Sequence, residues 1–179
     1  MSNKFIQLIL LLVISTGSFA QCEVKSFKIN DQITRYSMTE QFYRNQDLEN
    51  GMKIVNIYAN SFKDVSTKRV ILNNLVVTYV FSGYQREFAP GILVINLANG
   101  NTVNLKAKEK STNTINELPS PSSIKTIEGI FELTGSDVTS IKESSISLIY
   151  IRDTRQDANL DITPKYKSIL LEMLNCVNN

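Results

Sequence analysis

The residues with the most specific chemistry in this 179-residue chain are its two cysteines, Cys22 and Cys176. Thiols of exported proteins meet an oxidising compartment, where they form disulfides. A count of two allows a single pairing within the chain. We therefore predict a disulfide between Cys22 and Cys176. The alternatives are two free thiols, or a lipid anchor on Cys22.

The sequence contains no histidine, which removes several classes of active site. Catalytic triads built on imidazole and the common zinc sites all require that side chain. No phosphate-binding glycine pattern occurs among the seven glycines. We accordingly predict no catalytic residue, no cofactor and no metal, and expect a protein that is not an enzyme. A hydrolase that uses two carboxyl groups about 5–10 Å apart is the enzyme alternative.

Two short motifs match known sites only in part. Ser122–Lys125 fits S-x-x-K, the nucleophile motif of penicillin-binding proteins, but lies in a proline-containing segment without the partner motifs. Asp157–Asp161 has the D-x-N-x-D spacing of a calcium loop. Ile162 replaces its glycine and Ser168 replaces its glutamate. We interpret both segments as ordinary polar loops.

An aromatic and charged segment offers the best candidate for binding. The stretch SGYQREFAPG, residues 82–91, combines aromatic, charged and turn residues, and loops of this kind often carry function. Its candidate binding patch consists of Tyr84, Arg86 and Phe88, and the partner would be a protein, a peptide or a glycan. Tyr79 and Phe81, at strand spacing just before it, are typical of a core.

The first twenty residues have the features of a secretory signal peptide. One positive charge precedes the apolar run Phe5–Ile14, which is shorter than the ~20 residues that a membrane span needs. Ser18 and Ala20 fit cleavage after Ala20, whereas Gln21 does not fit lipoprotein processing at Cys22. We expect a secreted or periplasmic protein with no membrane span, a signal peptide at 1–20 and one globular domain at 21–179.

The charge balance argues against nucleic acid as a partner. The chain has 19 basic and 17 acidic residues, a net charge of +2. Removal of Lys4 with the leader leaves +1. So small a charge does not attract nucleic acid or a membrane surface by its bulk field.

The secondary structure that the sequence predicts for the domain consists mainly of strands. The clearest is Arg69–Phe81, with apolar residues on both faces, which indicates a central, covered strand. One face would hold Leu75, Val77, Tyr79 and Phe81, and a bend or bulge is expected at Asn73-Asn74. Other strands are expected at Val24–Ile29, Lys53–Tyr58, Lys125–Leu133, Ser145–Arg152 and Asn159–Ile162.

Ile92–Lys108 predicts a hairpin whose register follows from its apolar pattern. A three-residue loop, Asn99–Asn101, pairs Leu97 with Val103 and Ile95 with Leu105, so that apolar side chains share a face. Asn101 would then take the left-handed backbone conformation.

Two helices and one long loop complete the expectation. Residues 109–123 are polar and contain two prolines, which favours a surface loop. Ser136 is expected to cap a short helix that ends at Glu143. Thr163-Pro164 is expected to start a C-terminal helix whose apolar face packs on the sheet. The predicted fold class is α+β, mostly β. It has antiparallel sheets in a sandwich- or barrel-like arrangement, a short helix and a C-terminal amphipathic helix.

The leader ending in SFAQ, the INLANGNTVNL hairpin, the LTGSDVTSIKESSISLIYIRD unit and the C-terminal helix with Cys176 resemble uncharacterised exported proteins of Bacteroidetes-type bacteria. The resemblance implies a periplasmic or secreted location and supplies no activity. We therefore expect a non-catalytic binding or interaction module of the periplasm or cell envelope. A structural or assembly component of the envelope is the alternative.

Overall fold

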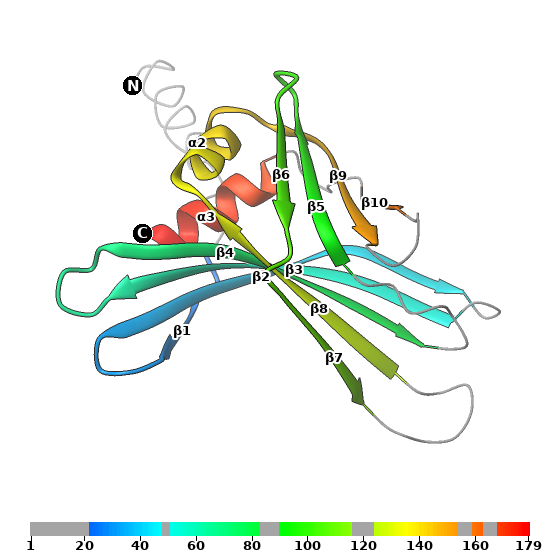
Figure 1. Ribbon diagram of the computed structural model, residues 1–179, viewed down its shortest axis with the longest axis horizontal. Coiled ribbons are helices and arrows are strands. Elements are labelled where there is room, and N and C mark those ends of the chain that lie inside the picture. The colour runs from blue at the N-terminus through cyan, green and yellow to red at the C-terminus, as the bar shows by residue number, and fades with distance from the viewer. Residues whose placement is uncertain (1–21, 48–50, 83–89, 116–123, 154–158, 163–167) are drawn as a thin grey trace, which may run out of the picture.

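The computed structural model describes residues 22–47, 51–82, 90–115, 124–153, 159–162 and 168–179. These residues form a six-stranded sheet, a four-stranded sheet and two helices (Figure 1). All strand pairs in both sheets are antiparallel. The large sheet has the order β1-β2-β3-β4-β8-β7, and the small sheet has the order β10-β9-β5-β6.

The large sheet is built on three long strands and three shorter ones. The long strands are β2 (Ile33–Asp47), β3 (Gly51–Asp64) and β4 (Val70–Ser82). The shorter ones are β1 (Lys25–Lys28), β7 (Glu109–Ile115) and β8 (Ile124–Leu133). At about 3.3 Å per residue, the 15 residues of β2 span roughly 50 Å, which is too long for one short helix to cover.

The small sheet and a helix together cover one face of the large sheet. The small sheet contains β5 (Pro90–Leu97), β6 (Thr102–Lys106), β9 (Ile146–Asp153) and β10 (Asn159–Ile162). It packs against β8 through β5 and β6, while helix α3 (Ile169–Asn178) lies on β2 and β3. In Figure 1 both coverings, together with helix α2 (Gly135–Glu143), lie on the same side of the large sheet.

The core lies between these layers. Alternate residues of β4 are buried there, as the sequence predicts: Leu75, Val77, Tyr79 and Phe81. The buried face of α3 is also as predicted, and consists of Ile169, Leu170, Met173, Leu174 and Val177. The fold-class prediction is therefore confirmed: a mostly β protein, with a short helix and a C-terminal helix packed on the sheet.

The C-terminal end of α3 is fastened to the large sheet by polar contacts. Ser61 Oγ donates to Asn178 Oδ1 at 2.9 Å, and Lys63 Nζ donates to the Asn178 carbonyl at 2.9 Å. The Lys63 ammonium also lies 4.7 Å from the centre of the Tyr36 ring. A cation at a helix C-terminus interacts favourably with the helix dipole, so β3 fixes where α3 ends.

The predicted disulfide is present and joins the same helix to the first strand. Cys22 and Cys176 are bonded, with Cα atoms 5.6 Å apart and a sequence separation of 154. Because Cys22 precedes β1 by three residues, the bond holds the start of β1 close to α3. No free cysteine occurs among the described residues.

The hairpin between β5 and β6 differs from the prediction by one loop position. Its three-residue loop is Ala98–Gly100, so Ile95 pairs with Val103 and Leu93 with Leu105. Gly100, rather than Asn101, takes the left-handed conformation, with φ of 87°. Glycine adopts that conformation without steric cost, and this decides where the loop sits. Compared with the prediction, each β5 residue pairs with the β6 residue two positions earlier. A shift by two keeps the same side chains on the same face, so the predicted apolar face still points to the core.

Other local predictions need correction. The bulge in β4 falls at Ile71, because Phe62 pairs with Leu72 and Lys63 with Val70; the predicted position, Asn73-Asn74, pairs regularly. Residues 109–115, predicted as loop, form the edge strand β7. Polar side chains suit an edge strand, where they discourage further pairing.

The cap of α2 also differs from the prediction. Thr134, rather than Ser136, is the N-cap, in a capping box with Asp137. Asp137 N donates to Thr134 Oγ1, and Thr134 N donates to Asp137 Oδ2. Helix α3 is described from Ile169, with Ser168 at its N-cap. The predicted start at Thr163-Pro164 and the signal peptide at 1–20 lie outside the described residues.

Candidate functional site

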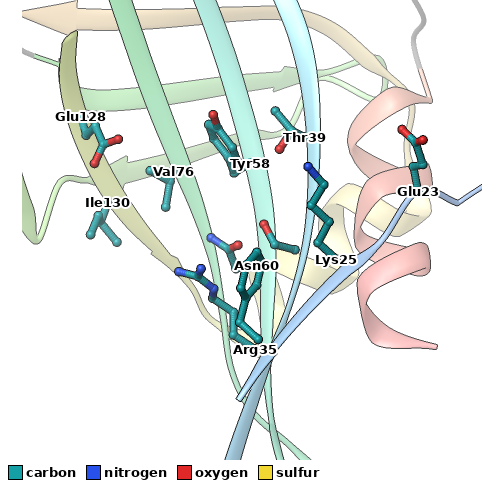
Figure 2. A pocket seen from close by; sticks show the side chains of 11 residues that line it. Glu23, Lys25, Arg35, Thr39, Tyr58, Asn60, Val76, Glu128 and Ile130 are labelled. Carbon is teal, nitrogen blue, oxygen red and sulfur yellow. The ribbon is translucent and has the colours of Figure 1, made fainter. Parts of the chain in front are cut away.

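The face of the large sheet opposite the core carries a hollow of about 450 Å³. None of the described helices or strands lies over this face in Figure 1. Eleven residues line the hollow, which we call the groove, and they come from β1, β2, β3, β4, β8 and the residues just before β1 (Figure 2). Because each strand supplies only a few residues, the groove runs across the strands. From β1 to β8 are four strand spacings, about 19 Å along the sheet.

The register of the sheet sets the order of side chains in the groove. Lys25 on β1 is opposite Ser37 on β2, and Ser37 is opposite Asn60 on β3. Asn60 is opposite Asn74 on β4, and its amide Nδ2 donates to Asn74 Oδ1 at 2.8 Å in a buried hydrogen bond. Residues directly opposite have Cβ atoms about 4.5–5.5 Å apart. One row across the sheet therefore brings an ammonium, a hydroxyl and an amide together.

A stacked arginine lies beside this row. Arg35 is opposite Phe27, and its guanidinium carbon lies 4.6 Å from the centre of the Phe27 ring. This is cation–π geometry. The Nε atom of Arg35 is buried and has no hydrogen-bond partner in the described residues. In Figure 2 the Arg35 guanidinium lies next to the Asn60 side chain. The ring covers one face of the guanidinium and restricts its orientation.

The middle of the groove is mixed in character. Thr39 is opposite Tyr58, Tyr58 is opposite Val76, and Val76 is opposite Ile130. Tyr58, Val76 and Ile130 are half-buried. Two hydroxyls therefore stand beside a small apolar floor. Figure 2 shows Lys25 extending toward Thr39 from β1.

Two carboxylates line the groove, and they lie at opposite ends. Glu23 precedes β1, whereas Glu128 is on β8 and is engaged in a further interaction. In Figure 2 Glu23 stands next to α3 and Glu128 is on the far side. These two acids do not form the close pair that carboxylate-based hydrolysis requires. Next to Glu128 in the sheet is Thr78, whose buried Oγ1 has no hydrogen-bond partner in the described residues.

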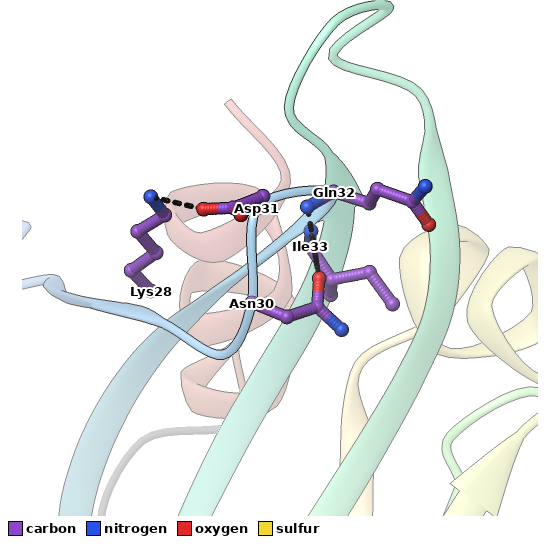
Figure 3. Close-up of polar contacts among 5 residues, drawn as sticks. All are labelled: Lys28, Asn30, Asp31, Gln32 and Ile33. Atoms are coloured by element: carbon purple, nitrogen blue, oxygen red, sulfur yellow. Dashed lines mark hydrogen bonds and ion pairs between the residues drawn. The ribbon is translucent and has the colours of Figure 1, made fainter.

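The turn between β1 and β2 fixes the register that places Arg35 on Phe27. Asn30 Oδ1 accepts hydrogen bonds from the backbone N–H groups of Gln32 and Ile33, at 2.9 and 2.8 Å (Figure 3). Lys28 and Asp31 form an ion pair of 2.7 Å across the same turn. This short-range polar structure compensates for the weakness of β1, a four-residue strand with every side chain exposed.

The sequence-predicted binding patch cannot be compared with the groove. Tyr84, Arg86 and Phe88 lie outside the described residues, as do Ser122, Ser123, Asp157 and Ala158. The other residues of those two motifs belong to strands β8 and β10. Tyr79 and Phe81 are core residues, as expected, with ring centroids 5.2 Å apart.

Sequence reasoning missed the groove because it missed β2. Residues 35–39 alternate polar and apolar residues, with Arg35, Ser37 and Thr39 on one face and Tyr36 and Met38 on the other. That alternation predicts a strand with one face away from the core. It is the signal that could have found the site.

No cluster of potential metal ligands is formed by the residues that the structure describes. Within the same part of the chain, neither helix has the length and apolar character needed to cross a bilayer.

Comparison with known proteins adds no further assignment. The chain matches no family model, and the searches of curated proteins and of solved structures found nothing similar to it.

Proposed function

We propose that this protein is an exported, non-catalytic binding module that holds a polar ligand in the groove. This proposal rests on the hollow of about 450 Å³ on the face of the large sheet opposite the core, which is lined by polar groups from several strands. Concave sites lined by apolar surface and a few placed polar groups are typical of ligand binding.

The groove face of the sheet also carries buried polar atoms without hydrogen bonds among the described residues. A buried polar atom without a hydrogen bond costs about 1–3 kcal/mol. Two such atoms, Arg35 Nε and Thr78 Oγ1, lie on this face of the sheet. Because both atoms are buried, a ligand would recover that cost only where the side chain turns to expose the atom.

The disulfide supports a location outside the cytoplasm. Disulfides persist in oxidising compartments and are rare in the cytosol. The Cys22–Cys176 bond agrees with the export expected from the leader, and we place the protein in the periplasm or outside the cell. An interaction module there would meet proteins, peptides and glycans.

The test is a binding screen in which the groove is filled by substitution. The disulfide-intact chain from Gln21 onward is screened by thermal shift and calorimetry against oligosaccharides and peptides. Thr39→Trp fills the groove from an exposed strand position and leaves the core untouched, so we expect binding to fall at least tenfold. Thr102→Trp, at an exposed position of β6 outside the groove, is the matched control and should bind normally. Equal binding by both variants would reject the groove as the site.

A further inference from the structure

We propose that the Arg35 end of the groove binds the carboxylate of an acidic carbohydrate. This inference rests on the proposed binding function and names the ligand class. Its starting point is the guanidinium of Arg35, which lines the groove and is stacked on Phe27. The two Nη groups of a guanidinium form a planar pair of donors, which matches the two oxygens of a carboxylate.

The surroundings of Arg35 hold this pair in position. Phe27 stacks on the guanidinium at 4.6 Å and restricts its orientation. The groove residues next to it in the register are Ser37, two positions along β2, and Asn60, opposite Ser37. A hydroxyl and an amide can hydrogen-bond the ring hydroxyls next to a sugar carboxylate.

The charge at this end of the groove is not neutralised within the described residues. Among the described residues the structure records two ion pairs, Lys28–Asp31 and Lys108–Glu132, and neither involves Arg35 or Lys25. Glu23 is four residues before Phe27, which is roughly 13 Å along an extended chain. The Arg35 end is thus cationic, whereas Lys25 lies two residues from Glu23, about 7 Å along the extended chain, and both line the groove.

The layout of the groove favours a carbohydrate over a peptide. A peptide that adds to a sheet does so along a free strand edge, whereas this groove crosses the strands on the face of the sheet. Its central side chains are the hydroxyls of Thr39 and Tyr58 beside the apolar surface of Val76 and Ile130. Sugars present hydroxyl edges and apolar C–H faces, and this lining can contact both.

The experiment compares charged and neutral forms of one sugar chain. Tetra-galacturonate is titrated into the disulfide-intact chain by calorimetry, and its methyl-esterified form is the neutral control. We expect the free acid to bind at least tenfold more tightly than the ester. Its affinity should fall with rising salt, because the contact is ionic.

Variants identify the residue that reads the carboxylate. Arg35→Gln should lower affinity for the acid at least tenfold and leave the ester unchanged. Arg35→Lys should also lose affinity, because lysine lacks the planar fork. Arg69→Gln, at an exposed arginine outside the groove, is the matched control and should bind as the parent chain does.

The outcomes separate this inference from the function on which it rests. Equal affinity for acid and ester, or an unaffected Arg35→Gln, would overturn the carboxylate assignment. If Thr39→Trp still abolished binding of a ligand in that case, the proposed binding function of the groove would stand. Competition by inorganic phosphate as strong as by the free acid, or preference for a carboxylate-terminated peptide, would overturn the carbohydrate assignment.

Discussion

Lys68 carries backbone strain that the turn between β3 and β4 imposes on it. Among the described residues it is the one non-glycine residue with positive φ, at 58°. A side chain in this left-handed conformation costs about 1–2 kcal/mol. The turn tolerates it because Lys68 N donates to the Asp64 carbonyl at 2.9 Å.

We expect Lys68→Gly to raise the free energy of unfolding by about 1 kcal/mol, because glycine adopts positive φ without that cost. Lys68→Ala is the matched control. It removes the same charge and keeps the strain, so its stability should stay near that of the parent. Denaturant unfolding of the parent and the two variants measures their free energies of unfolding. A Gly variant no more stable than the Ala variant would show that Lys68 carries no such strain.

Asp64 organises the same turn through its carboxylate. Its Oδ1 accepts hydrogen bonds from Ser66 and Thr67, through both the backbone N–H and the hydroxyl of each. The Ser66 hydroxyl has the largest effect, and with the Thr67 donors it lowers the pKa of Asp64 from 3.8 to about 2.

Because the folded pKa is below the unfolded one, the contribution of Asp64 to stability is complete above pH 3.8. It is lost as the pH falls through about 2. We expect an NMR titration to place the Asp64 carboxyl midpoint near 2. In Asp64→Asn the decline in stability between pH 4 and pH 2 should be smaller than in the parent. A midpoint near 3.8 would contradict the hydrogen-bond arrangement.

At the scale of elements, the short strand β1 depends on the turn that follows it. Asn30 Oδ1 accepts two backbone hydrogen bonds there, and β1 itself pairs through only four residues. Since β1 supplies Phe27 and Lys25 to the groove, the turn affects binding as well as stability.

Asn30→Ala should lower the free energy of unfolding by about 0.5–1.5 kcal/mol and also weaken binding in the groove. Asn99 serves as the matched control, because its Oδ1 accepts from Asn101 N in the turn between β5 and β6, away from the groove. Asn99→Ala should lower stability without changing affinity. Unfolding curves measure the stability of both variants, and calorimetry with the same ligand measures their affinity. If both variants lost affinity equally, the turn between β1 and β2 would have no specific role in binding.

How far the sequence predicts these elements depends on how local their signals are. The alternation in β4 and the helical spacing in α3 predict the faces that the structure buries, because each pattern is complete within one element. The position of the β5–β6 loop was predicted one residue late, because the apolar pattern fixes the face but a glycine fixes the turn.

The groove was less accessible to sequence reasoning. Its residues lie on strands distant in sequence, from Lys25 on β1 to Ile130 on β8. Only the strand order and the register bring them together, and no local pattern reports either. The stacking of Arg35 on Phe27 likewise depends on the pairing of β1 with β2.

At the scale of the whole molecule, the Cys22–Cys176 disulfide links the two ends of the described chain. It spans 154 residues, and chain entropy sets an upper limit of about 5 kcal/mol on its stabilisation. It also holds β1, which forms one end of the groove, close to α3.

Replacing both cysteines with serine should lower the free energy of unfolding by about 2–5 kcal/mol and speed amide exchange in β1 first. Parent protein with and without reductant gives the same comparison without substitution. Guanidinium unfolding and hydrogen exchange measure the two effects. Unchanged amide exchange in β1 would show that pairing with β2 protects this strand without the disulfide.

The central claim is that the uncovered face of the large sheet is a binding site. The most direct measurement is amide chemical-shift mapping of the isotope-labelled, disulfide-intact chain titrated with tetra-galacturonate. We expect shifts concentrated at residues 25–27, 35–39 and 58–60, with β6 and α2 unaffected. Shifts confined to the small sheet or the helices, or none at saturating ligand, would contradict it.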